Sequence, residues 1–289
     1  MKQKILIITL FLLILGQVSF AQDLSAYCAQ PHDLSSKTTR FLSNVTGTTA
    51  ISQNIANALI KRELRNSAGM KGLKVKIKSF SANDLLAGRF KSLTLNGSNL
   101  DFNGVHVSKF SAKTICDFNN IRATGNPIIF RDNFAMQYDI AISSDDLKKT
   151  VKSPTYQALL SMINVKTAGI NLFNIKDVDV SFKEDKFVFG LKMDNNVFGY
   201  SMPVAIDVAT KLLVQNGKIK VTELSLDNSN HKINLSNLTK VLNVINPLSF
   251  STDILGNEGT KVSVDNLKIE RSKLHLDGTL FVPKSQRIY

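Results

Sequence analysis

Two hydrophobic periods alternate along the chain. From Ala50 to Leu64 apolar residues recur every three to four positions, which predicts an amphipathic helix that ends at Gly69. From residue 73 the period drops to two, and residues 73–78 alternate apolar side chains with lysines. Such alternation is typical of antiparallel strands with one apolar and one polar face.

The period of two returns in later segments that turn signals separate. Asn96-Gly97, Asn103-Gly104 and Asn216-Gly217 are dipeptides typical of tight hairpin turns, and residues 183–186 predict another turn. The elements therefore begin as one helix followed by several strands.

Two further helices interrupt the strands. The first is predicted to begin at an N-cap formed by Ser144 and to be kinked or split at Pro154. The second runs through Leu238 and Ile245 and stops at Pro247. Few helices are thus available to cover many strands, which favours an α+β fold with a large curved antiparallel sheet wrapped around the helices.

The predicted domain organisation is simple. Residues 22–49 are rich in Ser, Thr and Asn with weak periodicity, and predict a loosely ordered lead-in. No linker rich in Pro, Gly or Ser divides the chain beyond it, so we expect residues 50–289 to form a single elongated domain.

The first 21 residues predict an export signal. Two lysines precede an apolar run, residues 5–15, that is too short to cross about 30 Å of hydrocarbon, and Ser19 and Ala21 provide the small residues of a cleavage site. We expect cleavage near Ala21 and a periplasmic, envelope-associated or secreted protein. The alternative is that the segment stays as an N-terminal anchor.

The excess of basic residues indicates the class of binding partner. Of the 289 residues, 36 are Lys or Arg and 23 are Asp or Glu, giving a net charge of +13 that favours an anionic partner. For an exported protein we expect that partner to be lipid at a membrane surface and not nucleic acid.

Cys28 and Cys116 are the only cysteines in the sequence. Export permits a disulfide between them, and two free buried thiols are the alternative.

The sequence carries no recognised motif for catalysis or metal binding. The four histidines lie far apart, and phosphate-binding glycine loops are missing. The nearest approach to a nucleophile elbow, around Ser201, lacks its second glycine and continues as a strand. We therefore expect no enzyme activity, no metal and no cofactor.

Two features of the predicted elements suit a ligand with an apolar tail and an anionic head. One is a surplus of apolar strand surface, for which an ordinary filled core is the alternative. The other is a basic surface on the first helix and the strand after it, for which a solvated face is the alternative. Its residues are Lys61, Arg62, Arg65, Lys74, Lys76 and Lys78.

Residues 74–77 and 84–95, with Leu-Leu-Ala-Gly-Arg-Phe at their centre, resemble the LmeA-like phospholipid-binding family. The resemblance is best over residues 51–121. It implies a tubular lipid-binding fold, in which a strongly curved antiparallel sheet wraps a long amphipathic helix and leaves an apolar groove for acyl chains. In such a fold Gly88 would permit a sharp turn, and Leu85 and Leu86 would plug the seam between sheet and helix.

We therefore expect an exported, non-enzymatic protein that binds phospholipid and associates peripherally with membranes. Lipid carriage and lipid presentation to envelope-assembly enzymes both fit. A structural or interaction module with a filled core is the main alternative, and a glycolipid hydrolase with an unrecognised site is another. The residues expected to contact acyl chains share their helix or strand spacing: Ile55, Leu59, Leu93, Leu95, Phe187 and Phe189.

Overall fold

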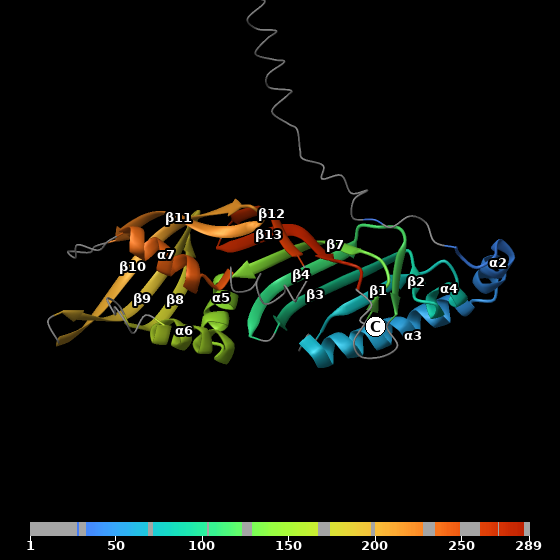
Figure 1. Cartoon of the computed structure of the whole chain (residues 1–289), viewed down its shortest axis with the longest axis horizontal. Helices are drawn as coiled ribbons and strands as arrows, with labels where there is room; N and C mark the ends of the chain where they lie inside the picture. The colour runs from blue at the N-terminus through green and yellow to red at the C-terminus, as the bar shows by residue number, and fades with distance from the viewer. Residues whose placement is uncertain are drawn as a thin grey trace, which may run out of the picture.

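The computed structural model describes residues 28, 33–68, 72–102, 104–122, 129–166, 174–197, 200–227, 235–248, 261–270 and 272–285, and all structural statements below concern these residues. They form an elongated molecule of helices and strands (Figure 1). The predicted export segment, residues 1–21, lies outside the described residues. Among the described helices, none combines the length and the apolar character that crossing a bilayer requires.

The first half of the chain contains three helices and seven strands within the described residues. They are α2 (Lys37–Val45), α3 (Thr48–Ala68), β1 (Lys74–Lys78), α4 (Ala82–Leu86), β2 (Arg89–Phe90), β3 (Ser92–Phe102), β4 (Val105–Thr114), β5 (Asn119–Arg122), β6 (Ile129–Phe130) and β7 (Phe134–Ser143). The remaining elements are α5 (Ser144–Val151), α6 (Pro154–Lys166), β8 (Asn174–Lys183), β9 (Lys186–Val197), β10 (Tyr200–Gln215), β11 (Lys218–Asp227), α7 (Leu235–Ile245), β12 (Lys261–Glu270) and β13 (Lys273–Val282).

The strands form two large sheets and one small one, and the described pairings are antiparallel. The six-stranded sheet has the order β1-β3-β4-β7-β13-β12, so the last hairpin pairs through β13 with β7 of the first half. The four-stranded sheet has the order β11-β10-β9-β8, and β2, β5 and β6 form the small sheet. Helix α5 packs on β4 and β8, and β10 contacts β12, so the two large sheets share one hydrophobic core. The prediction of an α+β fold with antiparallel sheets is confirmed.

Helix α3 confirms the helix predicted from residue 50, but it is not wrapped by a sheet. It lies beside β1 at the edge of the six-stranded sheet (Figure 1), where the Asn57 side chain accepts a hydrogen bond of 2.7 Å from the Ile77 backbone N–H. Ile51, Ile55 and Leu59 are each more than half exposed. The described sheets are open, and they do not show the single enclosed helix that the family resemblance implied.

The predicted split helix is confirmed as α5 and α6, which the residues before Pro154 separate. Its N-cap is Ser143 and not Ser144, because Asp146 completes a capping box with the hydroxyl and backbone N–H of Ser143. Burial alone raises the pKa of Asp146, but hydrogen bonds from Ser108 and Ser143 outweigh burial and hold the pKa below its ordinary value.

The turn predictions have mixed outcomes. Asn216 and Gly217 both have positive φ and join β10 to β11, and Gly104 lies between β3 and β4, as predicted. The turn predicted at Asn96-Gly97 is wrong, because β3 runs through it unbroken. A Cβ at Gly97 would lie 2.8 Å from a methyl carbon of Leu100, so this glycine makes room for a neighbouring side chain.

The segment predicted as a loose lead-in instead contains helix α2. Its N-cap is Ser36, whose hydroxyl accepts a hydrogen bond from the Thr39 backbone N–H. Ser35 fastens the start of the helix to α4, since its backbone N–H and its hydroxyl both donate to the Asp84 carboxylate, at 2.8 and 2.7 Å. Burial alone raises the pKa of Asp84, but hydrogen bonds from Ser81 and Ser35 and the charge of Arg89 lower it overall.

Candidate functional site

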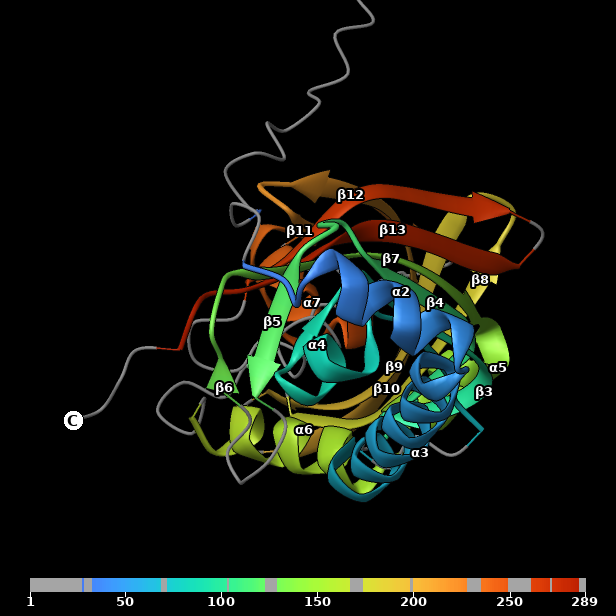
Figure 2. The same ribbon diagram turned by 90° about the vertical axis from the view of Figure 1, so that its right-hand side faces the viewer.

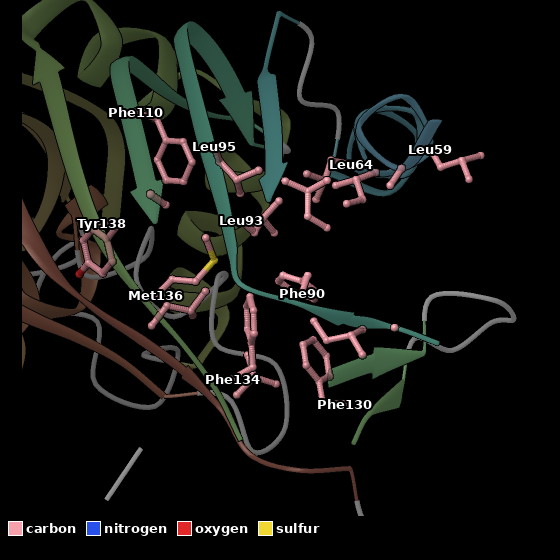
Figure 3. A pocket seen from close by; sticks show the side chains of 18 of the residues that line it. Leu59, Leu64, Phe90, Leu93, Leu95, Phe110, Phe130, Phe134, Met136 and Tyr138 are labelled. Carbon is pink, nitrogen blue, oxygen red and sulfur yellow. The ribbon is translucent and has the colours of Figure 1, made fainter. Parts of the chain in front are cut away.

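A cavity of about 870 Å³ lies against the apolar face of the six-stranded sheet (Figure 3). Its walls come from α3, α4, the small sheet and all six strands of the large sheet. Among the described residues that line it, only Ser52, Arg122, Arg131 and Tyr138 have polar side chains. The cavity therefore suits an apolar ligand far better than a polar one.

The back wall of the cavity is built from alternate residues of adjacent strands. Leu95, Ala112, Tyr138 and Gly278 lie opposite one another on β3, β4, β7 and β13. Tyr138 can lie over Gly278 because that residue has no side chain: a Cβ there would be 2.5 Å from the Tyr138 hydroxyl. The hydroxyl donates a hydrogen bond of 2.9 Å to the Ser263 carbonyl and is thereby occupied within the protein.

The cavity opens to solvent beside α3 and α4. Ala56 and Ile60 of α3 line it and are partly buried. Ile55, Leu59 and Leu86 also line it but are 58%, 59% and 82% exposed. These three side chains mark the mouth of the cavity. Leu86 therefore does not plug the seam between sheet and helix, as the sequence suggested, whereas Leu85 does pack against the core.

Gly88 forms the turn between α4 and the small sheet. Its φ of +83° suits glycine, and a Cβ would lie only 2.1 Å from the Ile121 carbonyl oxygen. The Ile121 backbone N–H donates a 2.9 Å hydrogen bond to the Gly88 carbonyl, which ties this turn to β5. The sharp turn predicted for the Leu-Leu-Ala-Gly segment is confirmed, and it brings α4 to the mouth of the cavity.

A family model described as LmeA-like phospholipid-binding matches residues 48–279. The chain belongs to this family. The matched region begins with α3 and ends within β13, so it contains nearly the whole wall of the cavity. No curated protein and no solved structure gives a match. The resemblance noted over residues 51–121 is confirmed and extends over both large sheets, and it makes the protein a lipid-binding one in general terms.

The structure separates the six residues that the sequence predicted for acyl-chain contact into two groups. Leu93 and Leu95 line the cavity and are mostly buried, and Ile55 and Leu59 line its mouth. Phe187 and Phe189 are fully buried on β9 and do not line this cavity. Their rings pack edge to face in the core of the four-stranded sheet, with centroids 4.7 Å apart.

The six basic residues predicted for headgroup or membrane contact are exposed. They are Lys61, Arg62, Arg65, Lys74, Lys76 and Lys78, and they belong to α3 and β1, which lie against each other. They form a basic outer surface next to the cavity mouth, and none of them lines the cavity itself.

Two arginines that sequence reasoning missed do line the cavity. Arg122 is the last residue of β5, and Arg131 directly follows β6. In the pairing of these strands, Arg122 lies opposite Ile129. The Arg131 backbone N–H donates a hydrogen bond to the Asn120 carbonyl. Both arginines therefore lie on one face of this strand pair, diagonally across it. No sequence signal joins them, because their proximity depends on the β5–β6 pairing.

Arg122 and Arg131 are exposed residues and form no ion pair with a carboxylate of the described residues. The described residues also contain no group of three or more His, Cys, Asp or Glu side chains placed to bind a metal ion. The charged side chains that line the cavity, among the described residues, are thus these two arginines.

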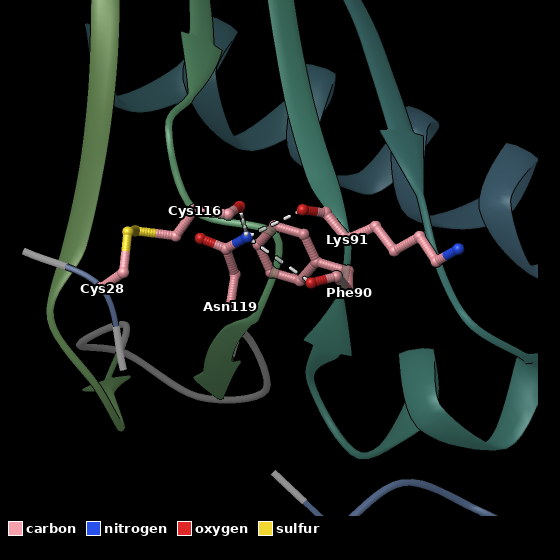
Figure 4. Close-up of a disulfide and its surroundings, with 5 residues drawn as sticks. All are labelled: Cys28, Phe90, Lys91, Cys116 and Asn119. Atoms are coloured by element: carbon pink, nitrogen blue, oxygen red, sulfur yellow. Dashed lines mark hydrogen bonds between the residues drawn. A yellow bond between two sulfur atoms is a disulfide. The ribbon is translucent and has the colours of Figure 1, made fainter. Parts of the chain in front are cut away.

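Cys28 and Cys116 form a disulfide that fastens the start of the described chain to the loop before β5 (Figure 4). Next to it, the Asn119 amide donates hydrogen bonds to the carbonyls of Cys116 and Lys91, at 2.8 and 3.0 Å. These contacts hold β5 against the strands that follow α4. They consequently fix one side of the cavity, including the strand pair that carries the two arginines.

Proposed function

We propose that the protein binds a phospholipid with its acyl chains in the apolar cavity, and that it performs no catalysis. The observation that carries this proposal is a cavity of about 870 Å³ with an almost wholly apolar lining, in a chain of the LmeA-like phospholipid-binding family. Such a cavity favours lipid binding over the main alternative, a structural or interaction module without a ligand.

The size of the cavity indicates how much lipid it holds. If a methylene group takes up about as much space as a water molecule, roughly 30 Å³, then 870 Å³ accommodates on the order of thirty such groups. Two fatty acyl chains of ordinary length contain about that number. Each buried methylene contributes roughly 0.8 kcal/mol against water, so the chains are retained without a specific polar contact.

The headgroup lies at the mouth in this proposal, where Arg122 and Arg131 can hold a phosphate. Arginine suits this role because its planar guanidinium group donates paired hydrogen bonds to phosphate oxygens. The basic outer surface on α3 and β1 then acts at longer range and attracts the protein to anionic membranes.

We further propose that the protein is exported and acts in the cell envelope, by carrying lipid or by presenting it to other proteins. The pattern of residues 1–21 and the disulfide support this location, since disulfides persist mainly outside the cytoplasm.

Extraction of lipid from the purified protein, followed by mass spectrometry, tests the binding proposal. We expect about one two-chain phospholipid per protein molecule. Purified protein that contains no lipid, and takes none up from vesicles, would contradict the proposal and support the filled-core alternative.

Paired charge variants test where the headgroup lies. Arg122→Gln with Arg131→Gln should broaden the bound lipids toward neutral headgroups, because the phosphate contacts are lost. Lys74→Gln with Lys76→Gln is the matched control: it removes the same charge from the outer surface, and should leave the bound species unchanged while weakening vesicle binding. The opposite result would move the headgroup site to the outer surface.

A further inference from the structure

Helix α2 packs against the protein with its polar side and presents its apolar side to solvent. The Ser43 side chain is buried; its hydroxyl shares a 2.8 Å hydrogen bond with that of Thr49 and accepts one of 3.1 Å from the Ala82 backbone N–H. On the other side, Phe41 and Val45 are 67% and 68% exposed. Surface helices normally have the reverse arrangement, so packing against the core does not account for this apolar stripe.

The apolar stripe of α2 belongs to a larger surface. Of the ten large hydrophobic side chains that are exposed among the described residues, seven lie on α2, α3 and α4. Helices α2 and α4 lie at one end of the molecule, and α3 runs from that end along the edge of the six-stranded sheet (Figure 1 and Figure 2). We name this surface the apolar tip, and its residues are Phe41, Leu42, Val45, Ile51, Ile55, Leu59 and Leu86. Three of the seven also form the mouth of the cavity, so the apolar tip and the cavity are continuous.

The charge around the apolar tip favours an anionic surface. Helices α2 and α3 contain five basic residues and one acidic residue in their sequences, and α2 has no acidic residue at all. Lysine or arginine near an anionic leaflet contributes about 1 kcal/mol each. A helix that lies in a membrane interface has this combination of an apolar stripe and flanking positive charge.

We infer that the apolar tip inserts into the interface of a bilayer that contains anionic phospholipid, with the α2 stripe buried among the headgroups and upper acyl chains. This places the cavity mouth against the membrane, so a lipid passes between bilayer and cavity without exposing its chains to water. The inference rests on the proposed function, because a lipid in the cavity needs such a route.

A single tryptophan tests the insertion, because the chain contains none. Phe41→Trp places the reporter on α2, and Leu213→Trp, on β10, is the matched control because Leu213 is also more than half exposed. With vesicles of mixed neutral and anionic phospholipid, we expect the emission of the α2 reporter to shift to the blue and to be quenched by brominated acyl chains. The β10 reporter should do neither.

Three results would overturn the inference. Emission from the α2 reporter that vesicles leave unchanged excludes insertion. Equal responses from both reporters indicate non-specific adsorption. Blue-shifted emission before vesicles are added means that another part of this chain, or a second copy of it, covers the stripe.

A loss-of-function pair separates this inference from the cavity proposal. Phe41→Ser with Val45→Ser should weaken partitioning into anionic vesicles by roughly ten-fold or more, since two large apolar contacts with lipid are removed. Lipid that is already in the cavity should still co-purify, because neither residue lines it. If wild-type protein contains lipid but does not insert, only the apolar tip is refuted; if it inserts but contains no lipid, only the cavity proposal fails.

Discussion

Replacing Leu95 by tryptophan should reduce lipid binding without destabilising the lipid-free protein. Leu95 lies on β3, points into the cavity and is 8% exposed (Figure 3). A larger side chain at this position enters open space and not a neighbouring side chain. Its effect should therefore differ in sign from that of the same change in a filled core.

The magnitude follows from the apolar surface that is buried. A buried leucine side chain is worth about 1.5–3 kcal/mol, and a tryptophan that buries about 150–250 Å² is worth about 4–6 kcal/mol at roughly 25 cal/mol per Å². Leu95→Trp should thus stabilise the lipid-free protein by up to about 2–3 kcal/mol. In the same cavity it should reduce the lipid bound per protein, because the indole ring occupies part of the acyl-chain space.

Leu191→Trp is the matched control, because Leu191 is at the middle of the four-stranded sheet, is 1% exposed and does not line the cavity. Overpacking there should cost about 1–3 kcal/mol and leave lipid content unchanged. The assays are denaturant unfolding of delipidated protein and mass spectrometry of bound lipid. Equal destabilisation by both variants, with lipid content unaltered in both, would refute the reasoning, since it would mean that Leu95 faces a packed core.

Three further predictions concern parts of the chain that frame the cavity. Gly88→Ala should lower the free energy of unfolding by more than about 2 kcal/mol, because its methyl group meets a backbone carbonyl, whereas Gly72→Ala, with similar φ and nothing within 4 Å, should cost only about 1 kcal/mol of strain. The hydrogen bonds that lower the pKa of Asp146 stabilise the fold at pH values above about 3.9, the ordinary pKa of aspartate. This stabilisation is lost as the pH falls through the lower pKa that Asp146 has in the folded protein. Asp146→Asn should therefore reduce the fall in unfolding free energy that is measured between about pH 5 and about pH 2. Reduction of the bond between Cys28 and Cys116, which are 88 residues apart, should cost about 4–5 kcal/mol and lower the melting temperature, measured with and without reductant.

The sequence predicted those elements whose pattern is local. The helical period from residue 50, the break before Pro154 and the Asn216-Gly217 turn each depend on neighbouring residues, and each is confirmed. The Gly88 turn was predicted from the family resemblance, and its physical cause is the nearby Ile121 carbonyl oxygen. The turn predicted at Asn96-Gly97 was wrong because a glycine can be required for close packing as well as for a turn. Only the contact with the Leu100 side chain, seen in the structure, shows that Gly97 is needed for packing.

The sequence could not assign residues to one sheet or the other. Phe187 and Phe189 have the same spacing of two as Leu93 and Leu95, so alternation alone makes both pairs candidates for the cavity wall. Which pair faces an open space depends on the strand order, and that order includes the long-range pairing of β13 with β7. Arg122 and Arg131 could not be predicted for the same reason, because only the pairing of β5 with β6 places them on one face.

Helix α2 was missed for a different reason. Its apolar stripe has helical spacing, but it is short and lies in a segment rich in Ser and Thr, which are common in loops. Serine and threonine here act as caps and as the buried face of the helix, since Ser36 caps it and Ser43 packs inward. A rule that places apolar residues inside would have put the wrong face of this helix against the core.

The contrast between the two sheets explains why a cavity persists. Beneath the four-stranded sheet, Phe187, Phe189 and Tyr156 fill the space with large, fully buried side chains. Beside the six-stranded sheet, α3 lines the cavity with two small residues, Ser52 and Ala56, and its larger residues Ile55 and Leu59 stay more than half exposed at the mouth. A closed, dry cavity costs about 24 cal/mol per Å³, which gives an upper limit on the order of 20 kcal/mol for 870 Å³. The mouth of this cavity is open to solvent, so the actual cost is below that limit.

Water is a poor filling for this space, because each buried water needs two to four polar partners and the lining offers few. An apolar ligand removes the cost without such partners. In the proposed function, the bound lipid therefore stabilises the folded state, and the open mouth beside α3 and α4 is the route by which it exchanges. A tryptophan at Leu95 supplies part of the same filling covalently, which is why it should stabilise the lipid-free protein while it reduces the amount of lipid that the cavity binds.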